Sequence, residues 1–580
     1  MGGLKKRDRS GVRRMRGRLG LALWLVLGLI GTAALPVAAG AEAKPIHLTI
    51  MHTNDVHGGI DPTGASFMDE EFPPLLGGGA SLARLADDER AKAEAEGDGF
   101  LLLDTGDIWQ GTPVGGFHSG EVVIEFMNKI GYDAWVPGNH EFDAGIDNAM
   151  KLIKMAKFPV LGANLVDKTT GQIPAPIVPY IIKEVAGVRI GLIGIITEET
   201  EFYSTEKNLG NLDLIPVKPV VQKYIDELRP KVDLIFVQGH IGVPFDVWSA
   251  YREMIETGSE QKIRYGMNAM ELAHYTRGID VMICGHIHVG LEQGWEDPLT
   301  HTICLQTYGR GTGVGVYTLN VDPQSKKIIG YTLPEADGSI VTLYEDEFWP
   351  EPEISQFLKE KIDSAEVGMD EPIGRAITDL TRVGVGESVL GDLVTDAMRE
   401  AVGADMAFTN LGGIRSNIPM GIITPREVFD AIPFENRLVY YDMTGSYLRH
   451  VLEWRVKGMR QGVYVSGVKV VYSRALPDFD RITVLTVGGR PWDPDSIYRV
   501  ATTDFIASGN IGLEILTTID PKYVHTTDAL VKDAVVDYIK RHSPLERRLE
   551  NRFVRDDAAQ YSPEISGVRA RWKPLESLTH

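Results

Sequence analysis

The sequence predicts an α/β protein with two domains, and three observations support this. The chain has 580 residues, which is more than a single hydrophobic core usually organises. Apolar runs typical of buried strands alternate with amphipathic runs typical of helices through the first half. A segment over residues 344–353 that is acidic and contains two prolines then interrupts the pattern, and a second mixture of strands and helices follows it.

The first half predicts strands and helices in alternation, an order that favours a sheet covered by helices. Strands are expected over residues 46–51, 100–103, 134–136, 188–196, 233–237 and 280–284. Helices are expected over residues 81–95, 121–130, 220–228 and 269–275. Between residues 302 and 333 strands follow one another without helices, which predicts an antiparallel end to the first domain.

The boundary region predicts where the second domain begins. Residues 354–362 have the pattern of a helix, and residues 368–372 have the composition of a linker. We therefore expect a first domain over residues 45–345, a linker helix region over 346–372, a second domain over 373–554 and a polar tail over 555–580.

Residues 1–41 have the composition of a secretory signal. A basic head precedes an uncharged, mostly apolar run over residues 19–35, and Pro36 and small residues up to Ala41 follow it. Cleavage after Ala41 would give a periplasmic or secreted protein without a stable membrane anchor. A retained anchor is the alternative, because the apolar run is only slightly shorter than a membrane-spanning helix.

Charge and cysteine content exclude some functions. The formal net charge of −21 argues against a nucleic-acid-binding surface, which needs clustered Lys and Arg. The only cysteines, Cys284 and Cys304, both lie in apolar, strand-like runs, so the chain is not a disulfide scaffold. Buried free thiols and a single disulfide both remain open.

Five short motifs of Asp, Asn and His each begin where a predicted strand ends. They contain Asp55 and His57, Asp107, Asn139 and His140, His240, and His286 and His288. Ligands of α/β sheets gather at the carboxyl ends of the strands, so we expect these side chains in one cleft. One such motif alone is more often a surface loop, but five in succession predict a metal site.

The residue types of these motifs limit the metal. Imidazole and carboxylate without thiolate suit Zn²⁺, Mn²⁺ or Fe. The candidates outnumber the ligands of one ion, and two divalent ions sharing a carboxylate account for the surplus. Asp107 is the expected bridge. Two ions about 3.5–4 Å apart would activate a water and hold the attacking and leaving oxygens.

At these motifs the chain resembles the 5′-nucleotidase family of calcineurin-like metallophosphoesterases. The matching segments are residues 52–58, 106–111, 138–143, 285–288 and 410–415. The resemblance extends over roughly residues 46–550. It implies a four-layer α/β/β/α metallophosphoesterase domain as the catalytic domain, and a second, smaller α/β domain of the 5′-nucleotidase C-terminal type that binds substrate.

The resemblance also implies roles for the motif residues. One ion would be held by Asp55, His57, Asp107 and His288, and the other by Asp107, Asn139, His240 and His286. His140 and Asp143 would form a catalytic dyad, in which the carboxylate fixes the imidazole tautomer and raises its pKa. Metal-bound hydroxide would be the nucleophile, without a covalent intermediate.

For the second domain, the resemblance implies a substrate site. Asn410, Gly413 and Arg415 would hold polar groups of the substrate, and a guanidinium suits phosphate because it donates in pairs. Phe434 and Phe505 would stack on the base.

Two departures from the family pattern affect this substrate site. Ile511 stands where the family has an Asp that binds ribose hydroxyls, and the arginine expected before Leu390 is represented only by Arg382, displaced in register. Losing a charged acceptor costs about 1.5–3 kcal/mol, enough to blur nucleoside selectivity.

The leading hypothesis is an exported hydrolase with two metal ions that releases phosphate from nucleotides or related small phosphoesters. One alternative keeps the metal domain and changes the substrate, giving a thiosulfohydrolase that acts on a sulfur-carrier protein. A second is a non-catalytic binding protein on the same fold. The oligomeric state remains open.

Overall fold

The computed structural model describes residues 44–557, except 66–67, 69–71, 201–205, 245, 259–265, 335–337, 384–385, 435 and 458–461. The expected signal over residues 1–41 and the tail beyond residue 557 lie outside the described residues. The fold is a mixture of α-helices and β-sheets, which confirms the predicted α/β class. Within the described ranges, no helix combines the length and apolar character needed to cross a bilayer.

The first of two large sheets in the N-terminal half contains strand β1. In the described part of the chain this sheet has six strands, in the order β15-β14-β1-β4-β5, and β16 also pairs with β14. β1, β4 and β5 run parallel, whereas β14 is antiparallel to β1, β15 and β16. The strands are β1 (Ile46–Thr53), β4 (Gly99–Asp104), β5 (Ala134–Trp135), β14 (Gly313–Val321), β15 (Ile328–Thr332) and β16 (Ile340–Thr342).

The second large sheet is mostly parallel. Among the described residues it has six strands in the order β12-β13-β11-β10-β8-β7. The four central strands are parallel, and β7 and β12 pair with them in the antiparallel sense. The strands are β7 (Tyr180–Val185), β8 (Val188–Ile196), β10 (Leu234–His240), β11 (Val281–Ile283), β12 (Trp295–Glu296) and β13 (Ile303–Leu305).

Apolar residues of both sheets meet in a common core. Ile190 and Phe236 of the second sheet belong to the same buried cluster as Leu48 and Ile50 of the first. Their neighbours in sequence face the other way, and Ile193 is one of those buried against the helices on the far side. This alternation follows from the two-residue period of a strand and gives the second sheet two buried faces.

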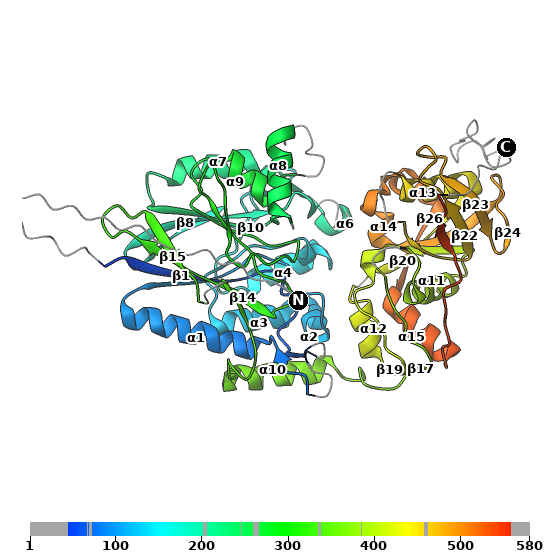
Figure 1. Ribbon diagram of the computed structural model, residues 1–580, viewed down its shortest axis with the longest axis horizontal. Helices are drawn as coiled ribbons and strands as arrows, with labels where there is room; N and C mark the ends of the chain where they lie inside the picture. Colours follow the sequence, from blue (N-terminus) through cyan, green and yellow to red (C-terminus); the bar gives the residue numbers. More distant parts are fainter. Residues whose placement is uncertain are drawn as a thin grey trace, which may run out of the picture. The chain divides into compact units, whose positions relative to one another are not determined.

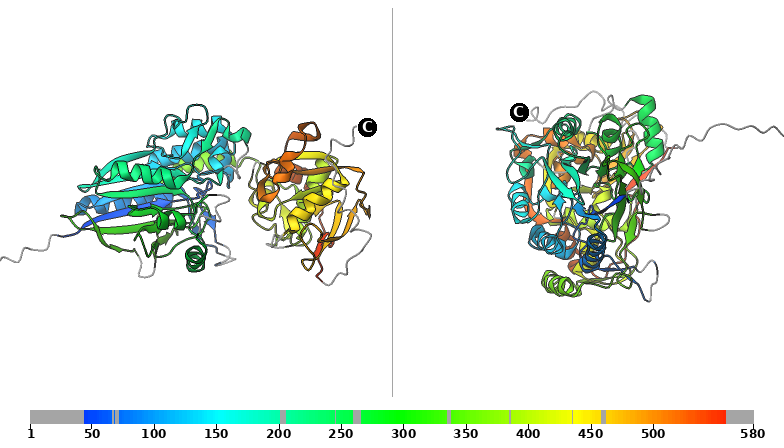
Figure 2. Two further views of the ribbon diagram at one scale, coloured as in Figure 1. Left: turned by 90° about the horizontal axis from the view of Figure 1, so that it is seen from above. Right: turned by 90° about the vertical axis from the view of Figure 1, so that its left-hand side faces the viewer.

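Helices cover the outer faces of the two sheets (Figure 1). α7 packs on β8 and β10, with α9 beside it and α8 next to α9, while α1 packs on β1 and β4 and contacts α10. The end-on view of Figure 2 also shows helices on both sides of the strands. The order of layers is therefore α/β/β/α. The helices are α1 (Gly79–Glu96), α2 (Pro113–Gly116), α3 (Glu121–Ile130), α4 (Ile146–Met155), α6 (Glu206–Leu209), α7 (Val217–Leu228), α8 (Val247–Thr257), α9 (Ala269–Tyr275) and α10 (Pro352–Ala365).

Predicted and observed elements differ mainly at their ends. Helix α7 begins at Val217 rather than at residue 220, because Pro219 lies in its first turn, where the missing N–H costs no helical hydrogen bond. Two short antiparallel pairs, β2 (Thr63–Gly64) with β3 (Leu75–Leu76) and β6 (Leu165–Asp167) with β9 (Leu212–Leu214), lie outside the large sheets. Cys284 and Cys304 are buried free thiols.

The C-terminal half has its own sheets and its own cores. A five-stranded sheet of the described residues has the order β21-β18-β25-β20-β26, and a four-stranded sheet has the order β24-β23-β22-β27. Two buried clusters draw only on residues 373–553, whereas the clusters of the N-terminal half draw on residues 46–365. The strands are β17 (Gly374–Ala376), β18 (Met406–Thr409), β19 (Gly421–Ile423), β20 (Arg437–Thr444), β21 (Tyr464–Ser466), β22 (Val468–Tyr472), β23 (Ile482–Val487), β24 (Arg490–Pro491), β25 (Ile497–Thr503), β26 (Val524–Leu530) and β27 (Phe553–Arg555). The helices are α11 (Val389–Ala401), α12 (Pro425–Ala431), α13 (Gly445–Val456), α14 (Asp504–Ala507) and α15 (Val531–His542).

Helix α11 contributes two buried acids with opposite electrostatic environments. Asp396 accepts hydrogen bonds from Arg547 (2.6 Å) and Arg552 (2.8 and 3.0 Å), and these partners outweigh burial and lower its pKa. Asp392 is only 2% exposed. Burial, helped by the negative charge of Glu387 and opposed by Arg552, raises the pKa of Asp392 to about 8.

We expect Asp392→Asn to stabilise the protein by about 1–2 kcal/mol at pH 8. A carboxyl whose pKa is higher in the folded state than in the unfolded state loses stability as the pH rises from the unfolded to the folded pKa. The gain from Asp392→Asn should therefore grow between about pH 4 and pH 8. Urea unfolding at pH 5 and pH 8 measures it. The matched variant Asp396→Asn should destabilise at both pH values, and a gain that does not depend on pH would contradict the prediction.

Candidate metal centre

The loops that follow β1 and β4 are joined by backbone hydrogen bonds. The N–H of Asp55 donates to the carbonyl of Gly106, and the N–H of His57 donates to the carbonyl of Asp107, each at 2.9 Å. The side chain of Asp55 reaches a third loop, because the N–H of His286 donates to both of its carboxylate oxygens at 3.0 and 2.8 Å. The loops after β1, β4 and β11 therefore form one connected unit.

A buried carboxyl, that of Glu141, connects the second and third motifs. It accepts hydrogen bonds from the N–H groups of Asp107 (2.9 Å), Ile108 (3.0 Å) and Gly138. Its exposed fraction is 0%. Burial is the main cause that raises the pKa of Glu141 to about 7, and the negative charge of Asp107 adds to it. Glu141 thus fixes the backbone on both sides of the centre.

The structure brings six candidate side chains into two groups that share one member. Within each group, one ligand atom per residue lies within 4.8 Å of the others. The first group is Asp55, His57, Asp107 and His288, and the second is Asp107, His240 and His286. Asn139 adjoins the second group, since its Oδ1 lies 3.1 Å from Nε2 of His240.

Asp107 lies at the centre of the site. Its Oδ2 is 3.1 Å from Nε2 of His240 and 3.9 Å from Nε2 of His57. Burial opposes ionisation of Asp107, but the imidazoles of His240, His140 and His57 outweigh it and hold the pKa of Asp107 well below its usual range. The centre therefore contains an ionised carboxylate with almost no access to solvent.

Five of these residues have a left-handed backbone. The φ angles of Asp55, His57, Asp107, His286 and His288 lie between 48° and 77°. Such a conformation is uncommon for residues other than glycine and costs of order 1–3 kcal/mol at each position. Five left-handed residues at one centre indicate that these loop conformations direct the side chains toward the centre at a cost in stability.

Two of the imidazoles are oriented from behind by backbone carbonyls. Nδ1 of His57 lies 3.1 Å from the carbonyl of Gln110, and Nδ1 of His240 lies 2.7 Å from the carbonyl of Thr105. A ring whose Nδ1–H is donated in this way presents its Nε2 lone pair to the centre. Burial lowers the pKa of His57 well below its usual value, which favours the neutral form that binds metal.

These donors fit a pair of divalent cations. Carboxylate, imidazole and amide oxygen converge on two positions that share Asp107, and no cysteine belongs to either group among the residues that the structure describes. Zn²⁺, Mn²⁺ and Fe prefer this mixture of N and O ligands.

His140 and Asp143 lie beside the centre. Nδ1 of His140 is 2.6 Å from Oδ2 of Asp143 and 3.0 Å from Oε1 of Gln110, while its Nε2 is 3.9 Å from Oδ2 of Asp107. Burial opposes protonation of the ring, but Asp143 and Asp107 outweigh it and raise the pKa of His140 to about 10. The ring can therefore carry a positive charge at neutral pH, next to the metal-ligand groups.

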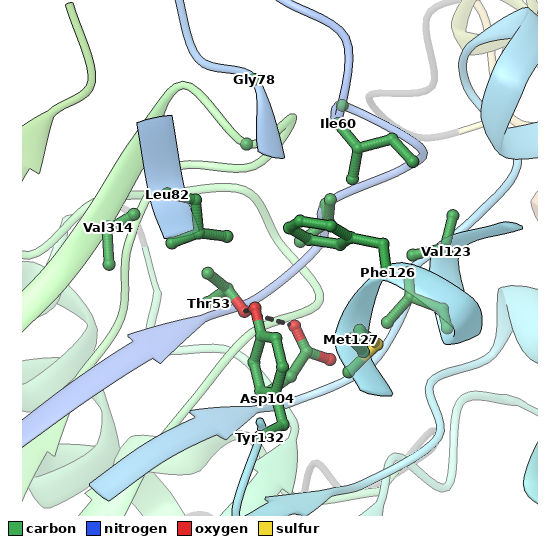
Figure 3. Close-up of a pocket in the computed structure, with 14 residues that line it drawn as sticks. Thr53, Ile60, Gly78, Leu82, Asp104, Val123, Phe126, Met127, Tyr132 and Val314 are labelled. Atoms are coloured by element: carbon green, nitrogen blue, oxygen red, sulfur yellow. Dashed lines mark hydrogen bonds between the residues drawn. The ribbon is translucent and has the colours of Figure 1, made fainter. Parts of the chain in front are cut away.

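Asp104 is the last residue of β4. Its side chain lines a small cavity with mostly apolar walls (Figure 3). Its Oδ2 accepts a hydrogen bond from Oγ1 of Thr53 at 2.6 Å, and that hydroxyl also lies 2.8 Å from the hydroxyl of Tyr132. Burial raises the pKa of Asp104 well above its usual value. Asp104 therefore ionises less readily than Asp107, three residues later, whose pKa is lowered.

The candidate substrate residues of the C-terminal half lie on three segments. Asn410 precedes the short 3₁₀ turn η4 (Leu411–Gly413), which contains Gly413, and Arg415 follows it. Cζ of Arg415 lies 5.9 Å from the centre of the Phe434 ring, and the Phe434 ring lies 6.1 Å from the His140 ring at an angle of 19°. Phe505, in α14, is partly buried against the adjacent hydrophobic core.

The two departures from the family pattern have visible structural consequences. Nη1 of Arg382 donates to the carbonyl of Ile414 at 2.9 Å. Burial, together with the positive charges of Arg310 and Arg382, lowers the pKa of Arg415, so Arg382 adds to the positive charge around Arg415 despite the shifted register. Ile511 has a φ of 56°, a strained value for a β-branched residue, within the turn η5 (Asn510–Gly512).

Sequence reasoning missed three residues of this centre. Glu141 was visible only as part of the Gly-Asn-His-Glu motif, and Gln110 only as part of Asp-Ile-Trp-Gln. Glu199, whose Oε2 lies 3.0 Å from Nε2 of His286, follows the apolar strand β8 just as the other motif residues follow theirs. A search for acids after every strand, and not only for His and Asp pairs, would have found Glu199.

Fold and donor set together define a calcineurin-like metallophosphoesterase, a class of metal-binding hydrolases. Residues 48–290 match the family model of the calcineurin-like phosphoesterases, and residues 369–518 match that of the 5′-nucleotidase C-terminal domain. A 5′-nucleotidase of Vibrio parahaemolyticus is 30% identical over 566 residues, covering 89% of this chain and 95% of its own. The chain belongs to the 5′-nucleotidase family.

Solved structures agree with this assignment. A 5′-nucleotidase precursor from Thermus thermophilus has a TM-score of 0.72 and 27% identity, covering 88% of this chain and 99% of its own. A sulfate thiohydrolase from Thermus thermophilus has a TM-score of 0.66 and 18% identity, covering 89% of this chain and 97% of its own. At that identity the likeness shows a shared fold alone.

Proposed function

We propose that the protein is an exported 5′-nucleotidase-like hydrolase that uses two divalent metal ions to release phosphate from nucleotides or related phosphoesters. The observation that supports this most strongly is the sharing of Asp107 between two groups of ligand atoms. One ion would be held by Asp55, His57, Asp107 and His288. The other would be held by Asp107, Asn139, His240 and His286. Zn²⁺, Mn²⁺ and Fe all suit these donors.

In this proposal the bound ions supply a nucleophilic water at neutral pH and offset negative charge on the phosphoryl oxygens. The chain provides the remaining chemistry. His140, held by Asp143, places a positive charge next to the phosphoryl group as charge develops there. Asn139 is the amide donor of the set, and the contacts that Glu141 makes with the neighbouring backbone support its loop.

The C-terminal half would bind the rest of the substrate. Asn410, Gly413 and Arg415 would hold its polar groups, with the charge of Arg382 adding to that of Arg415. Phe434 and Phe505 are proposed to stack on the base. We propose residues 45–345 as the catalytic domain and residues 373–554 as the substrate-binding domain, joined by the region 346–372. The separate hydrophobic cores of the two halves support two domains, and helix α10 of the joining region packs into the core of the first.

Export is proposed from the sequence of residues 1–41. A basic head, an apolar run and small residues up to Ala41 form the three parts of a cleavable signal. We therefore propose a periplasmic or secreted location. Mass spectrometry of the N-terminus of the mature protein tests this, because cleavage after Ala41 would leave Glu42 as the first residue.

A substrate panel tests the activity. With added Mn²⁺ or Zn²⁺, the protein should release inorganic phosphate from nucleotides, and elemental analysis should find two ions per chain. Chelation should abolish release, and added metal should restore it. Turnover of a sulfonated carrier protein but of no nucleotide would favour the thiosulfohydrolase. Failure to bind metal, with no turnover of any phosphoester, would indicate a binding protein.

A further inference from the structure

Glu199 lies directly behind one of the imidazoles of the metal centre. Its Oε2 is 3.0 Å from Nε2 of His286. The His286 side chain is only 10% exposed, while that of Glu199 is 38% exposed. The contact therefore links a buried imidazole to a carboxylate that is itself partly exposed to solvent.

The turn that carries Glu199 is fixed by its own hydrogen bonds. The turn follows β8, and the N–H of Glu199 donates to Oγ1 of Thr197 at 3.2 Å. The N–H of Thr200 donates to the carbonyl of Thr197 at 3.1 Å. The neighbouring Glu198 accepts from the N–H of Val217, the first residue of α7, at 2.9 Å. Glu198 and Glu199 thus point to different partners from one turn.

Glu199 is not a ligand of either ion in this geometry. Among the described residues, the group around the second position contains Asp107, His240 and His286 but not Glu199. Because Glu199 engages Nε2 of His286, the nitrogen that His286 offers to the ion is Nδ1. A proton fixed on Nε2 leaves the Nδ1 lone pair available.

This arrangement differs from that of the neighbouring rings. His57 and His240 are oriented by the neutral carbonyls of Gln110 and Thr105, whereas the partner of His286 is a carboxylate. A carboxylate behind a ligating imidazole fixes its tautomer and also makes the ring a stronger donor. The difference concerns the second position only, because His286 belongs to that group alone.

We propose that Glu199 is a positioning residue that fixes the tautomer of His286 and selectively strengthens binding of the second ion. This inference rests on the proposed two-ion function. The proposal predicts that a substitution of Glu199 changes the affinity of one ion position and not of the other, although Glu199 itself is not a ligand.

Metal affinity of Glu199 variants tests the proposal. In a chelator competition with Zn²⁺, Glu199→Ala should weaken one of the two sites by about 10- to 100-fold and leave the other unchanged. Glu199→Gln should fall between wild type and Glu199→Ala, because its amide oxygen still accepts the Nε2–H but carries no charge. Glu198→Gln is the matched control from the same turn and should bind both ions as wild type does.

A second measurement does not depend on metal. In metal-free protein, ¹⁵N–¹H spectra of the histidine rings should show His286 with its proton on Nε2, and this signature should become a mixture of tautomers in Glu199→Ala. Equal affinities of wild type and Glu199→Ala, or equal weakening of both sites, would overturn the proposal. A wild type that binds fewer than two ions would contradict the proposed function instead, and an unchanged His286 spectrum would still overturn the role of Glu199.

Discussion

Asp107→Asn is expected to lower kcat/KM for phosphoester hydrolysis by about a thousandfold or more and to reduce metal content below two ions per chain. Asparagine preserves the shape of the side chain and removes its charge. Asp107 belongs to both ligand groups, and its Oδ1 also accepts the N–H of His140 at 2.9 Å. One substitution should therefore weaken both proposed ion sites together. Steady-state kinetics and elemental analysis of the same preparation measure the two effects.

Asp104→Asn is the matched control for Asp107→Asn. Both residues are buried acids of one segment, but burial raises the pKa of Asp104, and among the described residues Asp104 belongs to neither ligand group. Asp104→Asn should keep both ions and most of the activity. If Asp107→Asn bound two ions and turned over substrate at a rate close to that of wild type, Asp107 would not be the bridge.

His140→Ala is expected to reduce kcat by about a hundredfold to ten-thousandfold while both ions remain bound. His140 is outside both ligand groups, yet its Nε2 is 3.9 Å from Oδ2 of Asp107. Removing it should therefore take away transition-state stabilisation and not metal. Kinetics combined with metal analysis separates this outcome from the loss expected for Asp107→Asn, and a parallel loss of metal would contradict the assigned role.

The pH profile gives a more specific test through Asp143→Asn. Removal of a neighbouring negative charge lowers the pKa of an imidazolium, so the pKa of His140 should fall from its value of about 10. If activity requires the protonated ring, it should begin to fall at a lower pH than in wild type as the pH is raised. The alkaline limb of the pH profile should therefore move down by about 1–2 pH units. An alkaline limb at the wild-type position would show that protonation of His140 does not control the rate.

Much of the fold could be predicted because strands and helices carry their own patterns. The buried alternation of β8 places Ile190 in one core and Ile193 in another, and its long apolar run is visible in the sequence. Helix α9 was predicted at its observed bounds, and the structure shows a capping box of Asn268 and Glu271 at its start. The face-to-face packing of the two sheets was not evident in any single segment and came from the family resemblance.

The candidate site shows where sequence reasoning ends. The placement of Asp55 and His288 at strand ends could be inferred, because Asp and His after an apolar run are conspicuous, although their roles as ligands stay a prediction. The contributions of Glu141 and Glu199 could not, since each depends on which backbone N–H or ring nitrogen lies opposite a carboxyl. The raised pKa of Asp104 depends on burial by distant segments, and the effect of Arg382 on the pKa of Arg415 depends on how the intervening loops fold.

Strand β1 is paired on both sides, and this limits where residues can be inserted into or deleted from the chain. β1 pairs with β14 and β4 from Leu48 to His52 without interruption, and Asp55 follows three residues later. A deletion within this strand would turn its buried residues to the opposite face and displace Asp55. The turn between β14 and β15, where the N–H of Ser325 donates to Asp322, carries no residue of the centre. Insertions should therefore be tolerated at that turn and rejected along β1, which a library of single-codon insertions and deletions could map.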